Sequence, residues 1–313
     1  MYLVLSHATA FRFWRTFTGN IRLLARPPQP KAMVEAFRPT PDIIAELLAL
    51  GVDPAGDDRI HLLFSEARLR SRTRNIASHV YSEALPEGAL VQLSEHVLAA
   101  SPELTYVQMS EVFTFERQAI AGMELCGSYA ILPDGSLKAR TALAHAEDLH
   151  TWASALAGPR SRGTLAAPFV LDGAASPMEA KLALLLTLPT ARGGYHLPAP
   201  VLNHRIDLGA EARRLYDAAF CRADLYWPEA RVDVEYDGLA YHEGEAHAVD
   251  VAREQALAAQ GISVMRLTYA QVEDPDAFAV VAKTLGKRLG RQVRVRHRDF
   301  VSNQLFLRAE LGL

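Results

Sequence analysis

Cysteine is scarce in this sequence. The chain contains two cysteines, Cys126 and Cys221, which lie far apart and form no CxxC pair. This spacing provides neither a disulfide framework nor the clustered ligands of a structural zinc site. We therefore expect both thiols to be small buried side chains.

Long hydrophobic runs are also missing. No apolar stretch approaches the roughly 18 residues that a membrane-spanning helix needs. The first residues, MYLVLSHATAFRFWRTF, lack the basic region followed by an apolar stretch that is typical of a leader peptide. We expect a cytoplasmic protein that does not enter a membrane.

Neither sign of charge dominates, because the formal net charge is −3. The net charge of the whole chain therefore does not indicate binding to nucleic acid. Two local runs are basic: Ala67–Arg74, with arginine at alternate positions, and 283–298, which contains no acid. Such runs can follow a phosphate backbone, and they can equally be solvated faces. Arg294 and Arg296 in the second run are candidate DNA contacts.

Length and composition predict two domains. The 313 residues, half of them hydrophobic and 22% charged, fit a globular protein and are too many for one ordinary core. The segment 159–173 is rich in Gly, Ala, Pro and Arg, which is typical of a boundary. We predict an α+β domain at 1–160 and, where strands alternate with helices, an α/β domain at 161–313 whose sheet is covered by helices on both faces.

Helix-start signals are clear at several positions. Thr40-Pro41-Asp42 precedes an apolar run and Gly51, which predicts a short helix with an N-cap, a first-turn proline and a C-terminal glycine. Ser101-Pro102-Glu103 predicts a longer helix that continues to residue 125. Further helices are expected at 144–158, 246–260 and 276–289, and strands at 59–65, 76–82, 89–101, 232–237 and 262–268.

An unusual acidic pattern lies in the stretch ADLYWPEARVDVEYDGLAYH, residues 223–242. In a strand over 232–237, the period of two sends Asp233, Glu235 and Asp237 to one face. Asp224 lies on the preceding apolar run, and a hairpin at the short PEAR connection would bring it near Glu235. Clustered carboxylates raise one another's pKa unless a cation intervenes, and Mg²⁺ prefers such oxygen ligands.

Structural explanations exist for the same acids. The three alternating acids also fit the solvated face of an edge strand, with Asp233 as strand surface. Ser176-x-x-Glu179 matches a capping box, in which the glutamate reaches back to the N-cap amide. Asp250 and Arg253, three residues apart, suit a helix surface pair. The aromatic side chains of Tyr226 and Trp227 fit a core.

The order of these residues resembles the PD-(D/E)xK nuclease superfamily, and within it the very-short-patch-repair-like endonuclease domains. The resemblance covers about residues 174–275 and consists of a helix glutamate, a strand-end aspartate, a VExDG strand, a histidine, an Asp-x-x-Arg helix and a strand ending near arginine. The matching residues here are Glu179, Asp224, Glu235, His242, Asp250, Arg253 and Arg266.

The resemblance implies an α/β/α restriction-endonuclease-like domain with a mixed sheet flanked by helices, and a DNA endonuclease that requires Mg²⁺ or Mn²⁺. Asp224 and Glu235 would be the metal ligands, and Glu179 would support the metal or a water. Arg222 and Arg253 are further candidate contacts to DNA. The lysine that the superfamily places two residues after the glutamate is replaced by Asp237. By analogy with the repair endonucleases, His242 is its candidate substitute, able to accept a proton near pH 7; a loop histidine without a role is the alternative.

The first half, with LSHATAFRFW, SPELTYVQMSEVF and GMELCGSYAI, resembles the antitoxin-like proteins of the abortive-infection AbiEi group. This likeness implies a role in phage defence. Antitoxins of that group usually begin with a winged-helix DNA-binding segment, which this sequence does not show, so the alternative to direct DNA reading is a structural or protein-contacting domain. Ser6 and His7 fit a helix N-cap as well as any chemistry. The rival to a nuclease is therefore a non-catalytic antitoxin-like or DNA-binding regulator with a degenerate nuclease fold. A sugar hydrolase would need only two acids, but the basic runs do not favour it.

Overall fold

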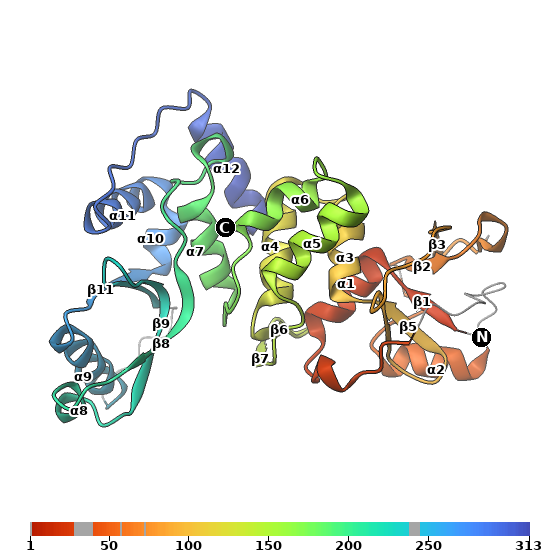
Figure 1. The fold of residues 1–313 in the computed structure, drawn as a ribbon, viewed down its shortest axis with the longest axis horizontal. Coiled ribbons are helices and arrows are strands. Elements are labelled where there is room, and N and C mark those ends of the chain that lie inside the picture. The colour runs from red at the N-terminus through yellow and green to blue at the C-terminus, as the bar shows by residue number, and fades with distance from the viewer. Residues whose placement is uncertain (1, 28–39, 57, 72, 238–244) are drawn as a thin grey trace. The chain divides into compact units, whose positions relative to one another are not determined.

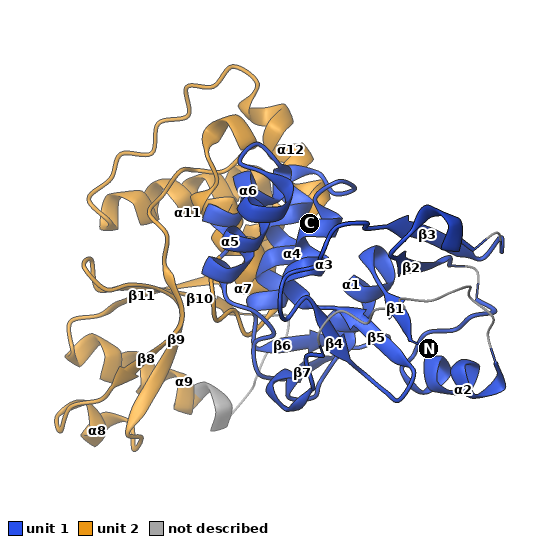
Figure 2. Cartoon of the chain, turned by 45° about the vertical axis from the view of Figure 1, so that its right-hand side comes forward, with its two compact units in different colours: residues 1–170 blue, residues 171–313 orange. Residues whose placement is uncertain are grey.

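The computed structural model describes residues 2–27, 40–56, 58–71, 73–237 and 245–313. The chain forms two compact units, Met1–Val170 (unit 1) and Leu171–Leu313 (unit 2) (Figure 2). The division falls inside the segment 159–173, whose composition is typical of a boundary. Both units mix helices and sheets, so the fold is mixed α and β (Figure 1).

Unit 1 contains a five-stranded mixed sheet in the order β3-β2-β1-β5-β4. The central strand β1 is parallel to β5 and antiparallel to β2. The outer pairs are β2 with β3, which are parallel, and β4 with β5, which are antiparallel. A two-stranded sheet, β6-β7, is separate. The strands are β1 (Leu3–Leu5), β2 (Ile60–Phe64), β3 (Ile76–Val80), β4 (Leu90–Gln92), β5 (Val97–Ala100), β6 (Tyr129–Ile131) and β7 (Leu137–Ala139).

The helices of unit 1 are α1 (His7–Thr16), α2 (Pro41–Ala49), α3 (Pro102–Met109), α4 (Phe115–Cys126), α5 (Ala146–Ala157) and α6 (Arg162–Ala166). Its core includes the fully buried side chains of Trp14, Phe64 and Tyr106. The indole of Trp14 donates a hydrogen bond to the carbonyl of Ala100 at 2.8 Å, which ties α1 to the end of β5. Unit 1 therefore has a core of its own.

Unit 2 contains a four-stranded sheet in the order β11-β10-β9-β8, with β8, β9 and β10 antiparallel and β10 and β11 parallel. The strands are β8 (Val201–Asp207), β9 (Phe220–Trp227), β10 (Val232–Asp237) and β11 (Ser263–Thr268). The helices are α7 (Pro177–Thr187), α8 (Ala212–Leu215), α9 (Glu245–Ala259), α10 (Tyr269–Glu273), α11 (Pro275–Arg288) and α12 (Phe300–Leu311). β10 is thus an interior strand.

Local capping chemistry explains where many helices begin. In four helices a capping side chain is followed directly by proline at the first helical position, which needs no N–H there. These pairs are Thr40-Pro41, Ser101-Pro102, Ser176-Pro177 and Asp274-Pro275. The helix predicted after Thr40 is confirmed, as are the helices near 144–158, 246–260 and 276–289.

Two predicted elements are wrong in extent. The single helix expected from Ser101 to residue 125 is two helices, because Thr114 caps a new start by accepting a hydrogen bond from the Arg117 amide. The single strand expected at 89–101 is two antiparallel strands, β4 and β5. In each case a turn interrupts an apolar pattern that continues on both sides.

Burial of the cysteines agrees with the expectation, since both Cys126 and Cys221 are buried. Tyr226 and Trp227 are also buried, as a core role requires. No helix in the described ranges combines the length and apolar character that a membrane crossing requires.

Candidate functional site

The candidate site of unit 2 draws carboxylates from three elements: Glu179 from the first turn of α7, Asp224 from β9 and Glu235 from β10. The hairpin between β9 and β10 pairs Val234 with Leu225, and the next position in that register sets Glu235 opposite Asp224. Directly opposite residues of antiparallel strands project to the same face. The short PEAR connection therefore brings together two acids eleven positions apart in the chain.

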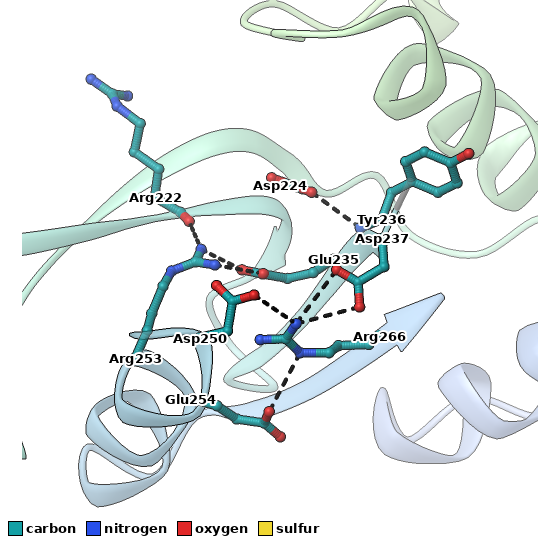
Figure 3. Close-up of polar contacts among 9 residues, drawn as sticks. All are labelled: Arg222, Asp224, Glu235, Tyr236, Asp237, Asp250, Arg253, Glu254 and Arg266. Atoms are coloured by element: carbon teal, nitrogen blue, oxygen red, sulfur yellow. Dashed lines mark hydrogen bonds and ion pairs between the residues drawn. The ribbon is translucent and has the colours of Figure 1, made fainter. Parts of the chain in front are cut away.

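The three acids affect one another electrostatically. Burial raises the pKa of Asp224 to about 6, with a further contribution from the Glu235 carboxylate. Burial also raises the pKa of Glu179 to about 7, and Asp224 adds to the increase. Glu179 is therefore close to half-protonated at neutral pH, a state that suits a group that exchanges protons with water. Asp224 accepts a hydrogen bond from the Tyr236 amide at 3.1 Å (Figure 3).

Glu179 is held by contacts that differ from a full capping box. The Ser176 hydroxyl accepts a hydrogen bond from the Glu179 amide at 3.2 Å, as an N-cap does. The Glu179 carboxylate, however, accepts from the amide of Ala175, which precedes the N-cap residue, at 2.8 Å. The same oxygen accepts from the side-chain amide of Asn203 at 2.7 Å. Glu179 thus stabilises the first turn of α7 and joins the helix to the sheet.

Asn203 is a site residue that the sequence pattern did not reveal. It lies in β8 with a φ of 50°, the left-handed region that asparagine tolerates better than most residues. The register that pairs Leu202 with Leu225 and His204 with Ala223 sets Asn203 opposite Asp224. The only sequence signal was an asparagine inside an otherwise extended segment, LNHRID.

Asp233 does not lie on the strand surface, and the prediction of a solvated edge strand is wrong. Its exposed fraction is 0%, that of Glu235 is 7%, and β10 lies between β9 and β11. Neither carboxylate oxygen of Asp233 has a hydrogen-bond partner. Burial, with Glu235 and Asp224 nearby, raises the pKa of Asp233 to about 9. An aspartate at this position is therefore protonated at neutral pH.

Arg253 of α9 binds Glu235 through both arms of its guanidinium. Nη1 donates to Oε2 at 2.6 Å and Nη2 donates to Oε1 at 2.5 Å, and Nη2 also donates to the carbonyl of Arg222 (Figure 3). Burial by itself would lower the pKa of Arg253, but Glu235 raises it above its ordinary value. Arg253 is thus tied to the sheet and does not form the helix surface pair with Asp250.

Arg266 of β11 is a cation beside Asp237, the residue two positions after Glu235. Its Nη1 lies 3.3 Å from an oxygen of Asp237 and 3.7 Å from an oxygen of Asp250, and its Nε lies 3.4 Å from Glu254 (Figure 3). Burial opposes the charge on Arg266, but Asp237 and Asp250 raise its pKa overall. A cation therefore does lie near this position, supplied by the neighbouring strand.

The donor chemistry fits a magnesium ion, because carboxylate oxygens are the ligands that Mg²⁺ prefers. The two buried oxygens of Asp233, which lack hydrogen-bond partners, add to this fit, because a nearby cation would favour the ionised form of this carboxyl. Within the described ranges, no three carboxylate, imidazole or thiolate groups form a complete metal cluster. Glu235 also directs both oxygens to Arg253, so metal ligation by Glu235 requires Arg253 to release one of them. His242 lies outside the described residues.

The other candidate DNA contacts lie at separate places on unit 2. Arg222 is exposed on β9, and its Nη1 donates to the carbonyl of Asn203 at 3.1 Å, beside the acids. Arg294 and Arg296 are exposed in the segment between α11 and α12. Arg294 donates to the side chain of Gln292 and lines a cavity of about 540 Å³ with His196. The structure brings Arg222 and Arg253 to the acids, and the exposed side chains of Arg294 and Arg296 fit either a phosphate contact or a solvated face.

Comparison with family models, with curated proteins and with solved structures found no match to this chain. Its function must therefore be argued from its own residues.

Proposed function

We propose that unit 2 is a Mg²⁺-dependent DNA endonuclease with the α/β/α architecture of the PD-(D/E)xK superfamily. The observation that supports this most is the link between Glu179, Asp224 and Glu235. The Glu235 carboxylate helps to raise the pKa of Asp224, Asp224 helps to raise that of Glu179, and Asn203 of β8 donates to the Glu179 carboxylate. Two of the acids therefore lie on neighbouring strands, β9 and β10, and Asn203 of β8 links the third, on α7, to the sheet.

Asp224 and Glu235 would hold the ion, and a bound cation would favour the ionised form of Asp233 on the same strand. When bound, Mg²⁺ would lower the pKa of a coordinated water and offset charge on the scissile phosphate. Glu179 is oriented by the Ala175 amide and Asn203, and its raised pKa suits it to accept a proton from the attacking water. Arg222, exposed beside the acids, would bind a neighbouring phosphate.

A second candidate function is a non-catalytic regulator that binds DNA or a protein with the same fold. Two ion pairs favour it: Arg253 neutralises Glu235 from within the chain, and Asp237 pairs with Arg266 where the superfamily uses lysine. Unit 1, with its AbiEi-like sequence, would then contact a protein partner. In both functions unit 2 binds the ligand. They differ because only the endonuclease hydrolyses what it binds.

The test is cleavage of supercoiled plasmid with Mg²⁺ or Mn²⁺ by the full chain. We expect nicked and linear products from the wild type, and none from Asp224→Asn or Glu235→Gln. Glu179→Gln should lower the rate by about 100-fold, the usual effect of losing a general base. Asp217→Asn, an exposed acid of the same unit, is the matched control and should keep the wild-type rate.

Cleavage that persists in both Asp224→Asn and Glu235→Gln would exclude the assigned site. Tight binding of DNA in the presence of a chelator, with no cleavage in either metal, would instead establish the regulator. Thermal melting of each variant separates loss of activity from loss of folding.

A further inference from the structure

Three histidines from separate elements of unit 1 form a stack of rings. His7 begins α1, His61 lies in β2 and His79 lies in β3. The ring centroids of His7 and His79 are 3.4 Å apart with an interplanar angle of 16°, and those of His61 and His79 are 5.1 Å apart. Nδ1 of His61 lies 2.9 Å from Nε2 of His79, a hydrogen-bond distance.

The backbone at His7 is held in an uncommon conformation. Its φ is 46°, in the left-handed region, and its amide donates to the side chain of Gln108 at 2.9 Å. Ser6 occupies the N-cap position of α1, but its hydroxyl makes no capping hydrogen bond and instead lies 3.1 Å from Nδ1 of His7. Gln108 thus holds the backbone of His7, and the Ser6 hydroxyl contacts its ring.

A cavity of about 770 Å³ opens beside this stack, within unit 1. Its polar lining includes His7, His79, Gln108, Arg160, Arg162 and one acid, Glu111. Arg162 donates through Nη1 to the carbonyls of Glu111 and Phe113, which fixes its side chain at the wall. The volume lies in the range of small-molecule sites.

The charge of this region is positive. Burial, together with the neighbouring histidines, lowers the pKa of His7 to about 3 and that of His79 to about 4. Both rings are therefore neutral at pH 7 and offer N–H donors. The positive charges of Arg59 and Arg70 also lower the pKa of His79, and Arg70 belongs to the basic run Ala67–Arg74. The rings stack in parallel, and no three of the described histidines and acids converge on a metal position.

We propose that this cavity binds a small phosphorylated molecule. Its phosphate would lie between the guanidinium groups of Arg160 and Arg162, which are suited to the planar, charge-assisted binding of phosphate oxygens. The N–H groups of His7 and His79 would complete the donor set. The remaining volume would hold the organic part of the ligand against Val80, Leu104 and Leu156.

The proposal is tested by calorimetric titration of the full chain with inorganic phosphate, pyrophosphate and AMP. We expect AMP to bind more tightly than inorganic phosphate, because only AMP fills the apolar part. Arg160→Gln and His79→Gln should each weaken AMP binding by about tenfold or more, the usual effect of losing a donor to a charged group. Arg214→Gln and His150→Gln, exposed residues away from the cavity, are the matched controls.

Proton NMR of the histidine rings provides a second readout. Addition of AMP should shift the ring signals of His7 and His79 and leave that of His150 unchanged. Arg160 is exposed, so its variant keeps the test decisive if His79→Gln does not fold. The site does not depend on unit 2, so Asp224→Asn should bind AMP like the wild type.

Three results would overturn the proposal. They are no binding of any of the three compounds at millimolar concentration, equal AMP affinity in the wild type and Arg160→Gln, and binding of a DNA duplex with no binding of the small phosphates.

Discussion

Replacement of Asp233 by asparagine should change how the stability of unit 2 depends on pH. The folded state raises the pKa of Asp233 from an ordinary 3.8 to about 9, chiefly through burial. Between these values the folded chain keeps a proton that the unfolded chain has released. Raising the pH therefore favours unfolding in this window, with a slope of about 1.4 kcal/mol per pH unit for one proton.

From pH 5 to pH 8 this slope amounts to a loss of about 4 kcal/mol in the free energy of unfolding, which Asp233→Asn should not show. Asparagine has nearly the same shape, so packing is preserved. Glu179 and Asp224 also titrate in this range, but both are present in both proteins and their contributions cancel in the difference. The variant should be the more stable protein at pH 8.

The assay is urea unfolding of the full chain at fixed ionic strength, with pulse proteolysis to identify the transition of unit 2. Asp217→Asn, which removes an exposed acid, should follow the wild type. Parallel pH profiles for the wild type and Asp233→Asn would refute the reasoning, since they would mean that Asp233 is ionised in both states. Saturating Mg²⁺ should flatten the wild-type profile, because a nearby cation lowers the pKa of Asp233.

Three further predictions concern neighbouring groups. Arg253→Gln leaves a buried carboxylate without its cation and should cost about 3 kcal/mol in urea unfolding, whereas Arg253→Lys should recover part of this loss; equal stability of all three proteins would contradict the role of the pair. Asn203→Gly tolerates the left-handed backbone and loses only the hydrogen bond to Glu179, whereas Asn203→Ala also strains the backbone. The alanine variant should therefore be less stable than the glycine variant by about 1 kcal/mol in thermal melting. The reverse order would exclude backbone strain. If the second basic run contacts DNA, Arg294→Gln and Arg296→Gln should each reduce the salt slope of DNA binding by about one, and unchanged slopes would leave that surface without a role in binding.

Local signals in the sequence predicted the helices with the greatest accuracy. Thr40-Pro41 begins α2 as expected, because an N-cap hydrogen bond joins residues three positions apart and needs no distant partner. The same reasoning missed the break between α3 and α4, where Thr114 is a capping residue inside an apolar run. Capping signals in the middle of a pattern therefore need as much weight as those at its ends.

Burial within the sheet was beyond the reach of the sequence. Apolar and acidic residues alternate over 232–235. This alternation is the same for an edge strand with a solvent-exposed face and for an interior strand whose acids lie on a buried face. The position of β10 between β9 and β11 decides between them, and that position follows from pairings with residues up to Thr268. The solvation of Asp233 was predicted wrongly for this reason.

The sequence by itself determined which residues start helices and which acids follow one another along β9 and β10, because both depend on spacings of a few residues. Only the tertiary structure decided that Arg253 neutralises Glu235, that Asn203 supports Glu179 and that His7 stacks on His79. The partners in these three contacts are 18, 24 and 72 residues apart in the chain. Contacts over such separations depend on strand register and on the free energy of hydration that each side chain loses when it is buried. Neither quantity is encoded in a local sequence pattern.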